Sequence, residues 1–360
     1  MAGNTALGKA KDAKQDEFYT QLSDIENELR HYRPHFKGKT VLCNCDDPYE
    51  SNFFKYFALN FNKLKLKKLI ATCYSGSPIT GTQLNLFGGD TDEQRRTPYK
   101  AVVTTVHDTT GEGGIDMLDV AELFRSGENV IEHLEGDGDF RSAECLELLD
   151  EADIVVTNPP FSLFREFITE ILEHGKKFVI IGHSNARKYA EVFPLIKDDM
   201  VWLGMTHPKR FYVPDSYQNS NVKVDENGRR YMQMGNISWY TNLDLKRRHE
   251  RVVLFRRYDP SVYPQYVNYD GIDVAHVGEI PCDYPGNMGV PINFLDQYNP
   301  DQFEIVGLGE GKLAKEMLGT KKCHDPRAGS KLEIQRPDGS YTCPFARIVI
   351  RNKYPEEPTK

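Results

Sequence analysis

A polar tetrapeptide that could do chemistry follows a short apolar run near the middle of the chain. Residues 153–157, Asp-Ile-Val-Val-Thr, have the β-branched composition of a buried strand, and Asn158-Pro159-Pro160-Phe161 follow directly. Ligands of open α/β sheets bind at the carboxyl ends of the strands, which is where this tetrapeptide is expected. Because two consecutive prolines fix φ and have no N–H groups, the carbonyls of this segment should point in set directions.

These residues are suited to activating an amino group on an aromatic ring. Such a nitrogen is a poor nucleophile because its lone pair is delocalised into the ring. If the side-chain oxygen of Asn158 and the carbonyl of Pro159 each accept one N–H, the nitrogen becomes more tetrahedral and its lone pair can attack a methyl sulfonium. Positive charge develops on the nitrogen, so fixed acceptors favour the transition state. Phe161 would stack on the ring.

The competing interpretation is a turn that simply ends the strand, because Asn-Pro is a common turn initiator. The position after an apolar strand, together with the aromatic residue in fourth place, favours a catalytic centre formed by Asn158, Pro159, Pro160 and Phe161.

Strand and helix patterns alternate around the tetrapeptide and predict an α/β fold with a doubly wound parallel sheet. The expected strands are residues 40–43, 69–74, 101–106, 130–134, 153–157, 177–182, 201–203 and 236–241. The expected helices are residues 21–33, 117–124, 145–149, 163–172 and 190–196, and a further one that carries Phe53, Phe54 and Phe57 as core residues. Pro34 is expected to end the first helix.

The composition of the sequence and its strand and helix patterns change along the chain, and these changes predict its domains. Residues 1–15 are expected to form a flexible tail and residues 16–245 a catalytic domain, in which residues 75–130 are a variable insertion. Beyond residue 245 Pro and Tyr become frequent and the alternation of strand and helix stops. Residues 246–360 are therefore expected to form a separate region.

Composition limits the class of protein. A chain of 360 residues, 39% of them hydrophobic, has room for one large α/β domain and a smaller one. It has no apolar run of about 18 residues and no apolar signal at its start, so a cytoplasmic protein without membrane contact is expected. Its seven cysteines are an odd number at scattered positions, which favours reduced thiols over a disulfide framework.

A metal site and a bulk positive surface are not expected. Cys323, His324 and Cys343 come nearest to a metal cluster, but no fourth ligand stands at a spacing typical of zinc. The net charge of −8 argues against a protein that coats nucleic acid, although it allows an enzyme with one basic face. Basic clusters occur at residues 63–68, 246–251 and 256–257, and each can also be an ordinary solvated surface.

Several segments together resemble the EcoRI-type DNA adenine methyltransferases. They are residues 16–21, 43–48, 51–57, 136–142, 153–166, 288–292 and 347–350, whereas residues 75–130 show no resemblance. The resemblance implies a Rossmann-like sheet that binds S-adenosylmethionine and a C-terminal target-recognition region over residues 246–360. It also implies a monomer that methylates N6 of an adenine flipped out of double-stranded DNA. Such an enzyme would serve a restriction-modification system, or be a related solitary or phage enzyme.

The resemblance also implies cofactor-binding residues. Phe18, Tyr19 and Thr20 would lie against the methionine part of the cofactor, Asn44, Asp46 and Asp47 would wrap it after the first strand, and Asp139 and Phe140 would hold its adenine. Two features depart from the usual pattern. The turn after the first strand is not Gly-rich, and the second strand ends without a carboxylate for the ribose. Either the sugar is held in a different way or another acidic residue binds it, and Asp46 or Asp47 is the expected residue.

Other activities remain open at this level. An Asn-Pro-Pro motif with an aromatic residue suits any planar amino group, so the substrate could also be an RNA base or a protein amide. A catalytically silent DNA-binding protein is a further alternative. Base reading is expected from the Arg, Tyr and Asn side chains that follow residue 245, since Arg and Asn match the edges of guanine and adenine.

Overall fold

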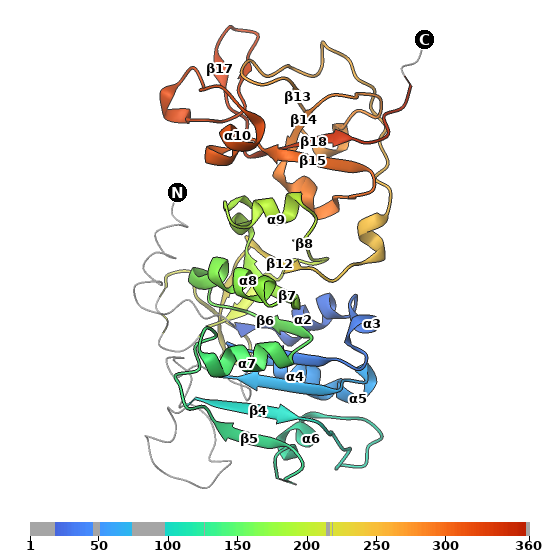
Figure 1. The fold of residues 1–360 in the computed structure, drawn as a ribbon, viewed down its shortest axis with the longest axis vertical. Helices are drawn as coiled ribbons and strands as arrows, with labels where there is room; N and C mark the ends of the chain where they lie inside the picture. Colours follow the sequence, from blue (N-terminus) through green and yellow to red (C-terminus); the bar gives the residue numbers. More distant parts are fainter. Residues whose placement is uncertain are drawn as a thin grey trace. The chain divides into compact units, whose positions relative to one another are not determined.

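The computed structural model describes residues 19–45, 51–73, 98–125, 127–213, 217 and 219–357. The chain forms two compact units (Figure 1). The first unit contains residues 1–186 and 204–243, and the second contains residues 187–203 and 244–360. The junction between Leu243 and Asp244 lies beside the expected boundary at residue 245, but residues 187–203 belong with the second unit. The predicted tail, residues 1–15, lies outside the described residues.

The first unit is built on a large mixed sheet with strands in the order β5-β4-β3-β2-β6-β7-β12. The bounds are β2 (Thr40–Cys43), β3 (Lys68–Thr72), β4 (Tyr99–Val103), β5 (Val130–His133), β6 (Ile154–Thr157), β7 (Lys177–His183) and β12 (Ile237–Thr241). The four central strands of this sheet run parallel to one another, in the order β3, β2, β6 and β7. The expectation of a parallel sheet is wrong at the outer strands, because β4 pairs antiparallel with β3 and β5, and β12 pairs antiparallel with β7.

A second sheet of the first unit joins its N-terminal strand to a later segment. It has the order β1-β9-β11-β10, with β1 (Tyr19–Thr20), β9 (Arg210–Tyr212), β10 (Lys223–Val224) and β11 (Arg230–Gln233). All its pairings are antiparallel. The sequence did not indicate this sheet, because its strands are short and polar.

The predicted helices of the first unit lie close to their expected positions. They are α2 (Leu22–Leu29), α4 (Asn52–Leu59), α6 (Met117–Glu122), α7 (Ala143–Glu151) and α8 (Phe164–Glu173). The structure adds short helices that the sequence did not indicate: α3 (Arg33–Phe36), α5 (Phe61–Leu64) and the 3-10 helices η2 (Phe161–Leu163) and η3 (Ser184–Lys188), of which η3 ends within residues 187–203 of the second unit. Pro34 does not end the first helix as expected. It occupies the first turn of α3, where the missing N–H has no helical acceptor to lose.

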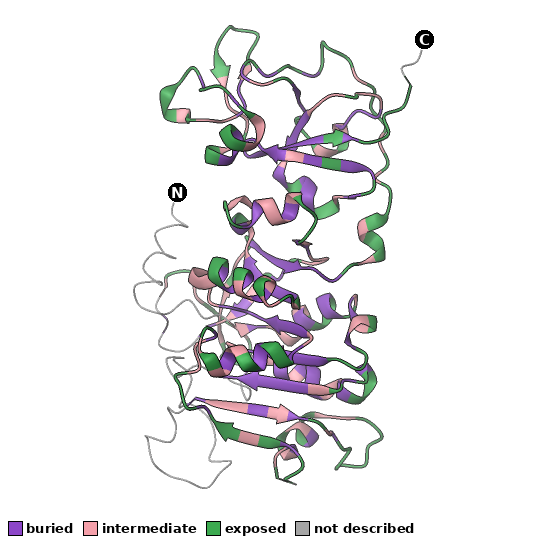
Figure 2. Ribbon diagram, viewed as in Figure 1, coloured by how far each residue is buried: buried purple, intermediate pink, exposed green. Residues whose placement is uncertain are grey.

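The core of the first unit lies on both faces of its central strands. All four residues of β2 and of β6 are buried, and Figure 2 shows the middle of this sheet as buried. Phe53, Phe54 and Phe57 of α4 are at most 2% exposed, which confirms the prediction that they are core residues. Parallel strands covered on both faces are typical of α/β proteins.

The second unit is a smaller mixed structure with a sheet in the order β13-β14-β18-β15. Its elements are β8 (Trp202–Leu203), α9 (Phe193–Lys197), β13 (Ile272–Asp273), β14 (Met288–Pro291), β15 (Phe303–Leu308), α10 (Gly311–Leu318), β16 (Ile334–Gln335), β17 (Tyr341–Thr342) and β18 (Arg347–Asn352). The 3-10 helices are η4 (Lys246–His249), η5 (Val277–Glu279), η6 (Ile292–Gln297) and η7 (Pro326–Ala328). A buried ion pair of 2.8 Å between Arg347 Nε and Asp273 Oδ1 joins β18 to β13.

Candidate active site

The tetrapeptide lies at the carboxyl edge of the central sheet. Asn158 follows β6, which is paired on one side with β2 and on the other with β7, and all three strands run in the same direction. The Thr157 hydroxyl donates a hydrogen bond to the Asn44 carbonyl and so ties the ends of β6 and β2 together. Asn158 is 7% exposed, Pro159 is buried, and Pro160 and Phe161 are half-buried.

The backbone of the tetrapeptide is held by the helix that follows it. The Leu163 N–H donates to the Pro160 carbonyl at 2.9 Å within η2, and the chain continues into α8. No backbone N–H of the described residues donates to the Pro159 carbonyl. The carbonyl that the sequence predicts as an acceptor is therefore not used by the backbone of this segment.

The turn after β2 contains a strained residue. Cys45 has a φ of 77°, a conformation that favours glycine, although the turn in which it lies has no Gly-rich pattern. Asn44 precedes it and is buried, and its side-chain oxygen accepts no hydrogen bond from the part of the chain that the structure describes. Asp46 and Asp47, the expected ribose ligands, lie outside the described residues.

The short strand β1 reaches the same region. The Asn52 amide at the start of α4 donates to the Thr20 carbonyl at 2.7 Å, so β1 lies beside the helix that follows the β2 turn. The Thr20 hydroxyl is buried without a hydrogen-bond partner among the described residues. Tyr19 is half-buried, and Phe18 lies outside the described residues.

Asp139 and Phe140 also follow a strand that ends at this edge. Strand β5 runs parallel to β3, since each is antiparallel to β4, so residues 135–140 start from the same edge as Asn158. Asp139 Oδ2 accepts from Arg141 Nη2 at 2.7 Å, and this guanidinium lowers the pKa of the carboxyl. Arg141 Nη1 also donates to Glu166 at 2.8 Å. The loop is thereby tied to α8.

The Phe140 ring packs into the core. It is 8% exposed and lies edge-on against Phe167 of α8, with ring centroids 5.0 Å apart. Arg141 lies over its face, 5.2 Å from the ring centroid. The geometry therefore gives Phe140 a packing role, and its contact with a cofactor stays a prediction.

His183 is a functional candidate that the sequence reasoning missed. It ends β7, next to β6, and its ring contacts the Asn236 side chain. His183 Nδ1 accepts the Asn185 N–H at 3.0 Å, and burial lowers the pKa of the ring, so the imidazole is neutral near neutral pH. The signal that could have found it is a histidine directly after the apolar run 177–182.

A cavity of about 690 Å³ in the first unit does not coincide with the tetrapeptide. Its lining includes Tyr56, Asn60 and Lys63, near the carboxyl end of α4, and Asp108 of the segment after β4. Because α4 starts at the carboxyl edge of the sheet and runs back, this cavity lies toward the opposite edge. None of the predicted site residues that the structure describes lines it.

The chain matches the model of one protein family over nearly its whole length. The model of a family described as the adenine-specific methyltransferase EcoRI matches residues 6–353, and so passes through residues 75–130, where no resemblance is visible from the residues alone. No solved structure matches the chain significantly. Among the described residues, no helix is long and apolar enough to cross a membrane.

Three curated relatives are Type II methyltransferases. M.EcoRI of Escherichia coli is 43% identical over 98% of this chain and 98% of its own length. M.MpnI of Mycoplasma pneumoniae is 37% identical over 83% of this chain and 84% of its own length. M.MgeORF184P of Mycoplasma genitalium is 36% identical over 83% of this chain and 85% of its own length.

These similarities cover nearly the whole chain, including the tetrapeptide and the sheet that carries it. A protein of this kind needs a methyl donor and acts on DNA. The chain therefore belongs to the EcoRI family of adenine-specific methyltransferases, and it is a DNA methyltransferase of the restriction-modification type.

Proposed function

We propose that the protein transfers a methyl group from S-adenosylmethionine to N6 of an adenine flipped out of double-stranded DNA, with Asn158, Pro159, Pro160 and Phe161 as its catalytic centre. The observation that supports this assignment is the position of Asn158 at the carboxyl end of the buried strand β6, beside the end of β2. In α/β sheets this is where ligands bind. The mixed sheet would then be a Rossmann-like cofactor-binding sheet.

The tetrapeptide acts as a rigid pair of acceptors. The Asn158 side-chain oxygen and the Pro159 carbonyl accept the two N–H bonds of the target amine and draw its nitrogen toward tetrahedral geometry. Since the prolines are stiff and η2 holds the Pro160 carbonyl, little reorganisation is needed as charge develops on the nitrogen. Phe161, which is half-buried, stacks on the base.

The edge of the sheet fits a polar cofactor. The Asn44 side-chain oxygen and the Thr20 hydroxyl are buried and have no hydrogen-bond partner among the described residues. Buried polar atoms of folded proteins nearly always have partners, so these two atoms suit the polar groups of a ligand. When bound, S-adenosylmethionine supplies an electrophilic methyl group on a sulfonium.

Further cofactor contacts are proposed from the chain order around this edge. Tyr19 and Phe18 precede Thr20, and Asp46 and Asp47 follow Asn44. The Asp139 carboxylate keeps lone pairs beyond those used by Arg141, so it can also accept from an adenine amino group. The Phe140 ring packs edge-on against Phe167 and so holds this loop on α8. One edge of the same ring is proposed to contact the cofactor.

The substrate must be presented to this site as an unstacked base. N6 of a paired adenine lies within the duplex, and extruding the nucleotide costs about a few kcal/mol. We propose that residues 246–360 recognise the DNA sequence and that the enzyme acts as a monomer.

The test is the substitution Asn158→Ala. It removes one of the two acceptors, so the rate of methyl transfer should fall by about 10² or more, as when one preorganised interaction with a transition state is removed. Binding of duplex DNA and of S-adenosylmethionine, measured by fluorescence anisotropy and calorimetry, should change little. Single-molecule sequencing of DNA from cells that express the protein reports the methylated base and its sequence context.

Two control variants separate chemistry from folding. Asn158→Asp keeps an acceptor oxygen and should retain more activity than Asn158→Ala. Asn227→Ala changes an exposed asparagine of the same unit and should leave the rate unchanged. Unchanged turnover in Asn158→Ala, or label from the methyl donor that enters only RNA or protein, would contradict the proposal.

A further inference from the structure

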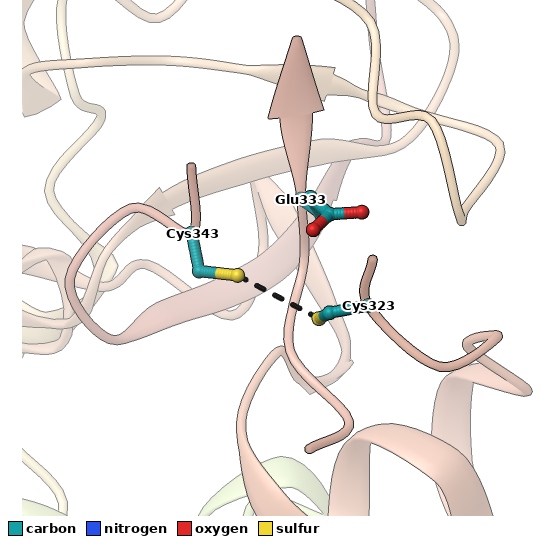
Figure 3. Close-up of side chains that lie close together, drawn as sticks. All are labelled: Cys323, Glu333 and Cys343. Atoms are coloured by element: carbon teal, nitrogen blue, oxygen red, sulfur yellow. Dashed lines mark hydrogen bonds between the residues drawn. The ribbon is translucent and has the colours of Figure 1, made fainter. Parts of the chain in front are cut away.

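The second unit brings together three potential metal ligands from separate segments. Cys323 follows α10, Glu333 precedes β16, and Cys343 follows β17. One ligand atom from each of the three residues lies within 4.8 Å of the others. Figure 3 shows the three side chains close together. Cys323 and Glu333 are buried and Cys343 is half-buried.

The distance between the two sulfur atoms suits a shared metal ion. The Cys343 Sγ and Cys323 Sγ atoms are 3.6 Å apart. Two thiolates at about 2.3 Å from a tetrahedral zinc ion lie roughly 3.8 Å apart, whereas a disulfide requires about 2.0 Å. The observed spacing is therefore close to one edge of a zinc tetrahedron.

The carboxylate beside these sulfurs is deeply buried. The Glu333 side chain is 2% exposed, and its Oε2 atom is 2.7 Å from His324 Nδ1. The His324 backbone N–H also donates to Glu333 Oε1 at 3.0 Å, and the His324 ring stacks on Tyr341 with centroids 3.6 Å apart. A buried carboxylate is costly unless it is paired or bound to a metal. A histidine that holds such a carboxylate is typical of the residues that orient metal ligands.

One buried side chain fixes the backbone on which the ligands stand. The Asn268 amide donates to the carbonyls of Lys331 at 2.7 Å and Lys321 at 3.0 Å. Its oxygen accepts the Glu333 N–H at 3.0 Å. Asn268 is 8% exposed. These hydrogen bonds hold the segment after α10 against the start of the hairpin formed by β16 and β17, independently of any ion.

We propose that Cys323, Cys343 and Glu333 bind a zinc ion, that His324 orients Glu333, and that solvent completes the coordination. Two thiolates and one carboxylate in a tetrahedral arrangement favour Zn²⁺ over Mg²⁺ or Ca²⁺, which prefer oxygen ligands. The dication would offset two of the three negative charges that the two thiolates and Glu333 carry. The spacing of Cys323, His324 and Cys343 along the chain does not indicate a metal site. The third ligand of the proposed site is Glu333, which is ten residues from each cysteine and lies close to both in the fold.

The ion would stabilise the small hairpin of the second unit. β16 and β17 are two residues each, and an isolated two-stranded hairpin is at best marginally stable in water. Zinc would fasten both ends of the hairpin to the segment that follows α10. This role is structural and does not depend on the proposed mechanism of methyl transfer.

The test is the metal content of the purified full-length protein, measured by mass spectrometry after gel filtration in chelator-free buffer. About one zinc ion per chain is expected, in line with one site of this type. The double variant Cys323→Ser/Cys343→Ser should lose it. Cys282→Ser, a buried thiol of the same unit outside the cluster, should retain it. His324→Phe keeps a ring against Tyr341 and should weaken zinc binding by about 10- to 100-fold.

A second measurement applies if the double variant does not fold. Cobalt(II) added to the metal-free wild-type chain should give the visible bands of a tetrahedral ion and thiolate charge transfer, and Glu333→Gln should weaken both. A folded chain that takes up neither zinc nor cobalt would overturn the proposal. So would a Cys323–Cys343 disulfide found by non-reducing mass spectrometry in freshly purified protein. Neither readout requires methyl transfer, so this proposal and the catalytic one can fail separately.

Discussion

Cys45 lies in the turn that follows the central strand β2 and has a backbone conformation that most residues avoid. Its φ of 77° is that of a left-handed residue. For an L-amino acid this conformation costs about 1–2 kcal/mol, and such strain is often found at functional sites. The preceding residue is fixed by the hydrogen bond from Thr157 to the Asn44 carbonyl, so the turn has little freedom to relax.

Cys45→Gly should therefore raise the free energy of unfolding by up to about 1 kcal/mol, because relief of strain exceeds the entropy that glycine adds to the unfolded chain. Urea denaturation measures this change. Lys65→Gly is the matched variant, since Lys65 also has a positive φ, of 54°, and is exposed. A decrease of stability in Cys45→Gly alone would show that the interactions of the thiol outweigh the strain.

At the scale of elements, a glycine allows helix α8 to pack against strand β7. A Cβ atom on Gly182 would lie 2.4 Å from the Phe164 ring, and the ring also packs against Tyr240 with centroids 5.0 Å apart. Phe164 begins α8, shortly after the tetrapeptide. The close approach of β7 and α8 thus fixes where Asn158 and Phe161 stand.

Gly182→Ala should destabilise the protein by about 1–3 kcal/mol, the usual cost of overpacking a core. It should also lower the rate of methyl transfer more than the affinity for DNA, because the displaced helix carries the end of the catalytic segment. Thermal melting and single-turnover kinetics measure the two effects. Gly235→Ala, at a position with open space, should stay within about 0.5 kcal/mol of wild type. Equal effects of the two substitutions would refute the packing argument.

A buried carboxylate organises the segment between β4 and α6. Asp119 Oδ1 accepts from the Thr109 N–H and hydroxyl, both at 2.7 Å, and Oδ2 accepts the Asp116 N–H at 2.9 Å in a capping box. Chiefly through the Thr109 hydroxyl, these bonds lower the pKa of Asp119 from 3.8 to about 2. The ionised form is therefore favoured in the folded state.

Because the folded pKa is depressed, the ionised carboxylate stabilises the fold fully above pH 3.8, and this contribution is lost as the pH falls through about 2. Asp119→Asn should be less stable than wild type at neutral pH, and the gap should close over this acidic range. Denaturation curves at several pH values provide the measurement. A gap that stays constant down to the lowest pH would rule out the charge as its cause.

At the scale of the whole molecule, the acidic protein must offer local positive charge to DNA. The net charge is −8, and the cluster at residues 246–251 is one of the basic groups of the second unit. Within this cluster, Arg248 forms ion pairs with Asp199 and Asp244. Its guanidinium carbon also lies 3.9 Å from the ring centroid of Trp202. Lys246 is exposed and Arg247 lies beside it at the surface helix η4. These two residues are the better candidates for binding phosphates.

The double variant Lys246→Ala/Arg247→Ala should weaken DNA binding to a similar extent for all sequences. It should also reduce the slope of log affinity against log salt by about 1 for each phosphate interaction that the substitutions remove. Anisotropy titrations at several salt concentrations measure this slope. Lys312→Ala, an exposed lysine paired with Glu316 on α10, serves as the control. An unchanged slope would exclude these two residues from the DNA interface.

The local sequence was sufficient to predict the strands that carry the site. β2, β6 and β12 occur where β-branched and aromatic runs indicate them, and Asn158 follows β6 as its position predicts. Such runs are local properties, and a proline pair fixes its own backbone. The family followed from motifs of the same local kind.

Only the tertiary structure decided how distant segments meet. It determined the antiparallel outer strands, the assignment of residues 187–203 to the second unit, and the meeting of Cys323, Glu333 and Cys343. Pro34 shows the same limit at short range, because a proline ends one helix or begins another according to where the chain packs next. Strand direction and side-chain convergence depend on long-range contacts, and residue type and spacing along the chain do not specify them.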